Sequence, residues 1–233
     1  AHVYAQACRR QPRETTIVAN CPRPMHTLPR PALREQLNGR LPSNARVVLY
    51  HGAVGAEHGL EFAVRSIPQW PENWCFVVKG RCAAPYRKYL EDLAERHGVN
   101  DRLVVYDPGF QSYADHLAFI AGADVAWTVL EPTCDNLKYS AYASNKRFEA
   151  MALGIPQIAD AGPNMRELFE SSGCGICIGT DDLDDACGRI RDFLLRVDRD
   201  NTMRSQSRRM HLDQFNYDAQ YRKIVKVLHN WIQ

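Results

Sequence analysis

The sequence predicts an α/β fold: a doubly wound, Rossmann-like sheet of six parallel strands. Short apolar runs alternate with helical patterns from about residue 46 onwards, which is the order of parallel strands joined by right-handed crossovers. The run at Ile155–Ala159 is apolar throughout, as expected of a strand buried on both faces. Polar residues and glycines follow the runs, where a doubly wound sheet binds its ligand.

Size and charge limit the classes of protein that fit. The chain has 233 residues, 45% of them hydrophobic, and a formal net charge of +2, so we expect one core and no nucleic-acid partner. No apolar run reaches the roughly 18 residues that span a bilayer.

The eight cysteines predict reduced thiols in a cytosolic α/β protein. The C-x-x-C at Cys174 and Cys177 has no second ligand pair, so we expect no metal there.

The chain is predicted to have two parts. Residues 1–45 are rich in Pro and Arg and are expected to form an arm, with a short strand at Thr15–Val18 and a short helix at Ala32–Leu37. Residues 46–233 are expected to form the sheet domain. Basic clusters near the N-terminus and at Arg204–Arg209 are interpreted as solvated surface.

The expected elements follow from apolar runs and helical spacing. The strands are expected at Val47–Tyr50, Trp74–Val78, Leu103–Tyr106, Asp124–Val129, Ile155–Ala159 and Gly175–Ile178. Helices are expected near residues 60–67, 86–94, 113–121, 183–197 and 217–231. The last helix carries an apolar stripe that packs on the sheet in a lone domain, or is partly exposed in a larger protein.

The stretch around which the domain is organised is Ala143–Ala159. Ser144 and Asn145 suit the start of a helix, Glu149 lies one turn inside it, and Gly154 and Pro156 end it before the fifth strand. The open end of such a helix offers unpaired N–H groups to an anion, and the carboxylate accepts hydrogen bonds from a hydroxyl group. These two features suit the phosphate and the ribose of a nucleotide.

The pattern N-K-x-F-E-x-M-A-x-G-x-P in this stretch resembles the signature of GT-B glycosyltransferases of the large retaining family 4, also called glycosyl transferases group 1. The resemblance extends more loosely from about Arg46 to the C-terminus. It implies that Glu149 binds the ribose of a nucleotide-sugar donor, and that the helix start, with Asn145 and Lys146, faces the diphosphate.

The resemblance also implies a function for the whole protein. The chain would be the C-terminal, donor-binding half of an enzyme whose N-terminal domain binds the acceptor and is missing here. The enzyme would transfer a hexose, with retention of configuration, from a nucleotide diphosphate sugar to a glycan or lipid-linked acceptor in polysaccharide biosynthesis. We expect no cofactor and no catalytic metal, and a cytoplasmic location, with peripheral contact to the inner face of a membrane left open. The fragment alone is expected to turn over little or nothing.

This chain departs from the family pattern at two places. Ala141 stands where the family has the first Glu of its E-x₇-E motif, so contacts to the transferred sugar are expected to pass to Asn136, Tyr139 or Tyr142. After the first strand, Gly52 is followed by Ala53 where the family has an Arg. Further along this loop His58 stands in place of a Lys, and a protonated His58 is expected to contact phosphate, with a plain loop histidine as the alternative.

Two further loops follow strands of the expected sheet. Lys79 comes directly after the second strand and is expected either to touch phosphate or to be solvated. In the family, the loop after the third strand lies near the nucleobase. Phe110 in that loop either stacks on the base or belongs to the core, and the core is favoured.

Two other function classes stay open. A sugar-nucleotide epimerase of the same architecture would bind a nucleotide but needs catalytic carboxylates and a His in the domain cleft. A non-catalytic GT-B-like scaffold would fit the altered diphosphate loop. Because no residue of this chain is a clear acid, base or nucleophile, no catalytic residue is assigned.

Overall fold

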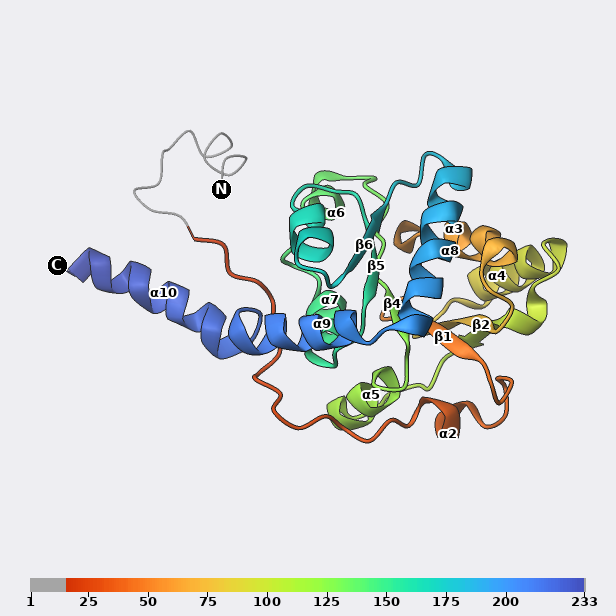
Figure 1. Cartoon of the computed structure of the whole chain (residues 1–233), viewed down its shortest axis with the longest axis horizontal. Coiled ribbons are helices and arrows are strands. Elements are labelled where there is room, and N and C mark those ends of the chain that lie inside the picture. The colour runs from red at the N-terminus through yellow and green to blue at the C-terminus, as the bar shows by residue number, and fades with distance from the viewer. Residues whose placement is uncertain (1–15, 233) are drawn as a thin grey trace.

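The computed structural model of the protein describes residues 16–232. Six parallel strands form one sheet, shown in Figure 1. The strands are β1 (Arg46–His51), β2 (Trp74–Lys79), β3 (Leu103–Tyr106), β4 (Val125–Trp127), β5 (Gln157–Asp160) and β6 (Gly175–Ile178). Their order, β3-β2-β1-β4-β5-β6, reverses direction between β1 and β4. The predicted doubly wound parallel sheet is therefore confirmed.

Helices cover both faces of the sheet. The longer ones are α3 (Leu60–Ser66), α4 (Ala84–Arg96), α5 (Tyr113–Ile120), α7 (Asn145–Ala152), α8 (Leu183–Arg199), α9 (Thr202–Asp213) and α10 (Tyr217–Ile232). Two short ones, α2 (Leu33–Leu37) and α6 (Asp135–Lys138), lie in the N-terminal arm and in the loop after β4. The remaining turns are η1 (Ala56–His58), η2 (Ile67–Gln69), η3 (Asn100–Arg102) and the π-helical η4 (Glu167–Ser171).

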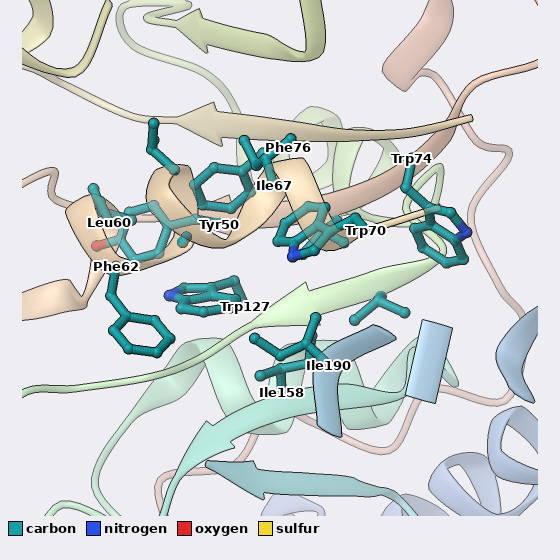
Figure 2. Packing of buried hydrophobic residues seen from close by; sticks show 14 of the residues in the cluster. Tyr50, Leu60, Phe62, Ile67, Trp70, Trp74, Phe76, Trp127, Ile158 and Ile190 are labelled. Carbon is teal, nitrogen blue, oxygen red and sulfur yellow. The ribbon is translucent and has the colours of Figure 1, made fainter. Parts of the chain in front are cut away.

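Alternation along the strands divides the core into two layers. Val48 and Tyr50 of β1 face α3, α4 and α8, whereas Val47 and Leu49 face α2 and α5 on the other side. In the first layer the ring of Phe76 packs edge-on against Trp127 at a centroid distance of 5.9 Å, and against Trp70 at 6.0 Å (Figure 2). This aromatic packing fixes β1, β2 and β4 at the centre of the sheet.

The N-terminal arm is partly packed on the domain. Leu33 and Leu37 of α2 are buried beside α5, so the helix predicted in the arm is present and adds to the core. The strand predicted at Thr15–Val18 is wrong for residues 16–18, which have no strand structure; Thr15 lies outside the described residues. Asn20 then hydrogen-bonds to Tyr142 through the two backbones.

Three other expectations need correction. The segment with Arg204–Arg209 belongs to α9, which packs on α7, and Arg204 reaches Asp124 at 3.3 Å, so this cluster is only partly solvated. Phe110 is 99% exposed, so the favoured assignment to the core is wrong. The fourth strand is shorter than predicted: β4 ends at Trp127, although the Thr128 amide still donates to the carbonyl of Ile158 in β5.

Two further features of the described part of the chain concern its cysteines and its last helix. The seven cysteines described there are all free thiols. The apolar stripe of α10 is largely exposed at Tyr217, Tyr221 and Leu228, and Figure 1 shows α10 extending away from the sheet. No helix among residues 16–232 is both long and apolar enough to cross a membrane.

Candidate nucleotide-binding site

The candidate site lies at the carboxyl edge of the sheet, where the strand order reverses beside β1. His51 ends β1 and Lys79 ends β2, and α7 begins at Asn145 beside the same edge (Figure 1). A crevice at this position is the usual ligand site of doubly wound folds. The structure therefore brings Gly52, Lys79, Lys146 and Glu149 together, although they are up to 97 positions apart in the sequence.

Glu149 lies on the wall of a pocket. Its side chain is 12% exposed and lines a cavity of about 220 Å³, together with Asn145, Tyr113 and the arm residues Asn20, Cys21 and Pro22. Helix α7 presents Glu149 one turn inside its start, on the same side as Asn145, because residues four apart share a helix face. In the described part of the chain, the Ser144 side chain accepts no hydrogen bond from this helix. The first-turn amides are therefore not capped by that hydroxyl.

Three side chains hold the Glu149 carboxylate. His116 Nε2 lies 3.5 Å from its Oε2, His51 Nδ1 lies 3.8 Å away, and the Tyr113 hydroxyl also donates to it. Burial alone raises the pKa of Glu149, but the hydrogen bonds from His116 and Tyr113 outweigh it and leave the pKa lowered. Glu149 is thus an ionised hydrogen-bond acceptor at neutral pH.

His51 contributes as a neutral ring. Burial lowers its pKa to about 3, and Lys146 and Lys79 add to that effect against the opposing charge of Glu149. Its contact with Glu149 is therefore not an ion pair at neutral pH. The other ring nitrogen, Nε2, is buried without a hydrogen-bond partner among the described residues.

Two partly desolvated lysines flank the carboxylate. Lys146 Nζ lies 3.1 Å from the Tyr50 hydroxyl and 4.4 Å from the centre of that ring. Lys79 is only 3% exposed, which rules out the solvated alternative, and its Nζ lies 3.0 Å from His116 Nδ1. Burial lowers the pKa of each lysine to about 8. Both remain mostly protonated at neutral pH, so their positive charges attract a bound anion.

Glycines bring the loops after β1 and β2 into close contact. Gly52 has φ +128° and Gly80 has φ +152°, values that favour glycine. A Cβ on Gly80 would lie 1.8 Å from the carbonyl oxygen of Gly52. The Lys146 side chain passes 3.5 Å from the position of a Cβ on Gly52, so the backbone of this loop is close to the lysine.

His58 is near the site but is not a cation in this environment. Burial, together with the charge of Lys146, lowers its pKa to about 4. Its ring packs at 5.2 Å from that of Tyr50, and its backbone carbonyl accepts a hydrogen bond from Trp127. The protonated state expected from the sequence is therefore disfavoured unless a bound anion raises this pKa.

None of the residues expected to face the sugar, Asn136, Tyr139 and Tyr142, lines the Glu149 pocket. Asn136 and Tyr139 are exposed on and after α6. Tyr142 stacks on Phe215 at 6.4 Å and lines a second cavity, of about 550 Å³, together with Tyr217 and Tyr221 of α10. Ala141, at the position of the family's first Glu, is buried.

Sequence reasoning missed His51, Tyr113 and His116. Each belongs to a different element from Glu149, so only the folded chain brings them together. His51, His116 and Glu149 place one ligand atom each within 4.8 Å of one another, a donor set that divalent metals accept. The two ammonium groups of Lys79 and Lys146 nearby disfavour a dication there, and they favour a phosphate anion.

The geometry can be compared with known proteins. The model of a family described as glycosyl transferase-like matches residues 51–226. A comparison with curated proteins found no significant match. Among solved structures, sucrose-phosphate synthase from Thermosynechococcus elongatus has a TM-score of 0.71 at 21% identity, over 99% of this chain and 56% of its own.

Two other solved structures help to place the chain. Anabaena HepE, solved in complex with UDP-glucose, has a TM-score of 0.67 at 19% identity, over 85% of this chain and 51% of its own. The C-terminal domain of the group 1 glycosyl transferase LpcC from Francisella tularensis has a TM-score of 0.59 at 14% identity, over 87% of this chain and 100% of its own. The chain thus spans little more than half the length of the first two structures.

Proposed function

The chain belongs to the glycosyl transferase-like family, and we propose that it is the donor-binding half of a GT-B enzyme that transfers a hexose from a nucleotide diphosphate sugar. One observation carries the proposal: an ionised Glu149 lies on a pocket wall beside the start of α7, with the buried Lys79 and the half-buried Lys146 close enough to interact with its charge. A carboxylate that accepts from hydroxyls, next to cations and helix amides that attract phosphate, matches the parts of one nucleotide diphosphate.

Each part of the donor has a counterpart in the site. In this proposal the ribose hydroxyls donate to Glu149, which Tyr113 and His116 hold in place. The diphosphate lies over Gly52, Lys146 and the first amides of α7. Because Lys146 already points at the backbone of the β1 loop, little rearrangement is needed to reach a phosphate at that place.

The chemical role of this half is to stabilise the leaving group. As the bond between the hexose and the diphosphate breaks, negative charge builds on the phosphate oxygens. Protonated Lys146 and the amides of α7 stabilise that charge without reorganising, because the fold already fixes them. Retention of configuration, as in the retaining family that the motif resembles, is part of the proposal.

The complete enzyme needs partners that this chain does not supply. We propose that an N-terminal domain binds a glycan or lipid-linked acceptor, and that the reaction belongs to polysaccharide biosynthesis on the cytoplasmic side of a membrane. WaaG, a similar structure with a TM-score of 0.71 at 18% identity, is described as a glycosyltransferase of lipopolysaccharide biosynthesis. The exposed stripe of α10 and the 550 Å³ cavity beside it suit contact with such a domain.

A non-catalytic role is a second candidate, because two contacts of the family pattern are missing. Ala53 and Ala141 replace an Arg on the diphosphate and a Glu on the sugar. His58, which follows in the same loop, is held neutral. A scaffold that kept the fold and lost the donor would show these changes.

Calorimetric titration with UDP, GDP and ADP separates the two candidates. UDP is the first choice, because HepE was solved with UDP-glucose and with UDP. Binding of one nucleoside diphosphate that is weakened by Glu149→Gln supports the transferase. No binding of any of the three at millimolar concentration supports the scaffold.

A further inference from the structure

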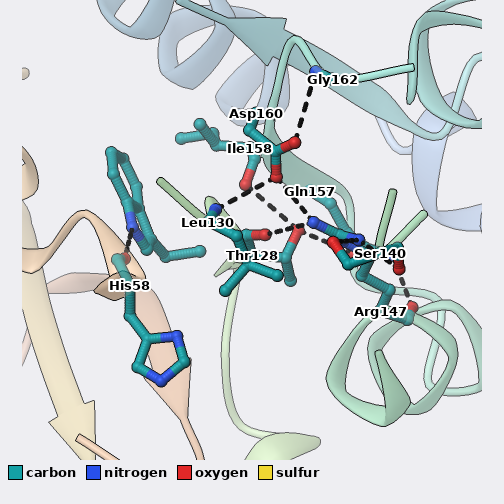
Figure 3. A network of polar contacts seen from close by, with 10 residues as sticks. His58, Thr128, Leu130, Ser140, Arg147, Gln157, Ile158, Asp160 and Gly162 are labelled. Atoms are coloured by element: carbon teal, nitrogen blue, oxygen red, sulfur yellow. Dashed lines mark hydrogen bonds and ion pairs between the residues drawn. The ribbon is translucent and has the colours of Figure 1, made fainter. Parts of the chain in front are cut away.

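Arg147 lies between two residues of the candidate site but points away from the pocket. Its side chain is fully buried, at 0% exposure, although arginine is almost never buried without a partner. Figure 3 shows its guanidinium group directed toward β4, β5 and the turn that precedes α7. The site residues Lys146 and Glu149 flank it in the sequence, so its contacts decide how this helix is held.

One partner of Arg147 is the turn that leads into α7. Its Nη1 donates to the carbonyl oxygen of Ser140 at 2.8 Å and to the Ser140 hydroxyl at 3.1 Å. The same carbonyl accepts from the Ala143 amide at 3.0 Å. The guanidinium therefore closes the turn of residues 140–143, from which the chain enters the helix at Asn145.

The other partner is Asp160, at the end of β5. Arg147 Nη2 donates to its Oδ1 at 2.6 Å. The same oxygen accepts from the Leu130 amide at 3.1 Å, and Oδ2 accepts from the Gly162 amide at 3.3 Å. One carboxylate thus joins the loop after β4 and the loop after β5 to α7 (Figure 3).

The helix backbone is held from the sheet as well. Gln157 Nε2 donates to the carbonyl oxygen of Arg147 at 2.8 Å, and the Thr128 hydroxyl donates to Gln157 Oε1 at 3.2 Å. Arg147 Nη2 also donates to the carbonyl of Thr128 at 3.2 Å. The register of α7 against the sheet is therefore set by directional bonds rather than by apolar packing alone.

A buried ion pair is a poor way to gain stability. Apolar residues of similar volume usually stabilise a core as well or better, because two charges must leave water to form the pair. What the pair provides here is a fixed direction: its bonds end on particular groups of the turn before α7, at Ser140, and of the chain after β4 and β5, at Thr128, Leu130 and Gly162. Such supporting contacts decide how accurately a binding site is held.

We propose that Arg147 and Asp160 are a positioning pair that fixes the turn at residues 140–144, and with it the first amides of α7 and the Lys146 ammonium, for the diphosphate of the donor. The inference rests on the proposed function for the identity of the ligand. That the pair holds the turn at residues 140–144 does not depend on which ligand binds.

The test uses a double variant, Arg147→Met with Asp160→Asn. It removes both charges, keeps side-chain volume, and leaves an amide oxygen for the Leu130 amide, losing only the longer contact with the Gly162 amide, so the fold is expected to persist. Exchange of the Ala143 amide with deuterium is expected to become about tenfold faster, while amides of β1 and β2 exchange as before. The Kd for UDP is expected to rise about tenfold, and the affinity for uridine to change less than about twofold.

Two further variants complete the experiment. Arg189→Met with Glu170→Gln removes a second ion pair of 2.6 Å, which joins η4 to α8 and lines no part of the Glu149 pocket, and is expected to change neither exchange at Ala143 nor the Kd. Arg147→Lys keeps the charge opposite Asp160 but loses the fork that reaches Ser140, so an intermediate result is expected. If the double variant does not fold, Arg147→Lys alone provides the test of exchange at Ala143 and of the Kd for UDP.

The outcomes are distinguishable. Unchanged exchange at Ala143 in the folded variants overturns the positioning pair. Faster exchange with an unchanged Kd for UDP overturns its link to the diphosphate. If the unaltered protein binds none of UDP, GDP and ADP, the proposed function fails, and the exchange measurement still decides whether the pair holds the turn.

Discussion

Lys79 and Glu149 lie on opposite sides of one imidazole ring. Lys79 Nζ is 3.0 Å from His116 Nδ1, and His116 Nε2 is 3.5 Å from Glu149 Oε2. When Lys79 donates to Nδ1, the proton of the neutral ring sits on Nε2 and faces the carboxylate. A cation from β2 and an acceptor from α7 are thereby held at a fixed separation.

Replacing His116 by Phe tests this linkage. The ring and its stacking on Tyr113 at 6.2 Å are retained, but both polar contacts are lost. We expect the Kd for UDP to rise about tenfold, which corresponds to about 1.4 kcal/mol, the size of one or two net hydrogen bonds. The exposed His97 is the matched control, and His97→Phe should leave the Kd unchanged. Equal effects of the two variants would contradict the linkage.

The pH dependence of binding follows from the lysines. Burial lowers the pKa of Lys146 and of Lys79 to about 8, and only the protonated form attracts the diphosphate. Affinity for UDP is therefore expected to be highest below about pH 8 and to fall as the pH rises through it. Lys146→Arg keeps its charge at every such pH and should flatten the decline in calorimetric titrations from about pH 6.5 to about pH 9.5. A decline of the same size in this variant would show that Lys146 is not its cause.

Lys146 also costs stability. Its folded pKa lies below the unfolded value, so the unfolded chain binds more protons above about pH 8 and the free energy of unfolding rises with pH from there. At pH 7 the folded protein bears the whole destabilisation that results from burying the charged Lys146 side chain. Lys146→Met is expected to raise the free energy of unfolding by about 1–3 kcal/mol while weakening UDP binding. Urea denaturation at pH 7 measures the first effect, and a destabilised variant would contradict it.

Gly80 is expected to tolerate no side chain. The Cβ of Gly80→Ala would meet the Gly52 carbonyl at 1.8 Å, so the β1 loop must move. We expect a loss of at least about 2 kcal/mol in thermal or urea unfolding, together with weaker nucleotide binding. Gly188→Ala, in α8 with nothing within 4 Å of the new Cβ, is the control and should be neutral or slightly stabilising. A neutral Gly80→Ala would mean that the two loops are not in close contact.

The paired cysteines are expected to be unreactive. Burial raises the pKa of Cys174, and it raises that of Cys177 to about 12, so neither forms the thiolate that reacts or binds metal. Peptide-resolved labelling with iodoacetamide at pH 8 should modify the exposed Cys134 long before either of them. Rapid labelling of Cys177 would reopen a redox or metal role.

The strands and the α7 motif could be predicted from the sequence because each is a local pattern. Apolar runs gave all six strands, and the residues from Ser144 to Pro156 carry both the helix and its ends. Helix α9 was missed because its buried residues include Ser207 and His211 beside Met203, so no apolar stripe marks it. Two of its arginines turn inward, Arg204 to Asp124 and Arg208 to the carbonyl oxygen of Met25.

The surroundings of Glu149 could not be predicted, because they are tertiary. His51, Tyr113 and His116 come from β1 and α5, and no spacing in the sequence connects them with α7. The ion pair links Arg147 of α7 to Asp160 at the end of β5, and no local pattern in the sequence connects these two residues. Burial also set the charge state of His58, which the sequence alone left as an expected cation.

The assignment of Glu149 to the ribose is tested most directly by calorimetric titration of UDP, GDP and ADP into the protein and its Glu149→Gln variant. The amide side chain of this variant fills the same space, so the fold is expected to be retained. It lacks the negative charge and one acceptor oxygen, so its hydrogen bonds to the ribose hydroxyls are expected to be weaker. We predict that one nucleoside diphosphate binds the unaltered protein and binds the variant at least about tenfold more weakly. Equal affinity of both proteins would contradict the assignment of Glu149 as the residue that holds the donor.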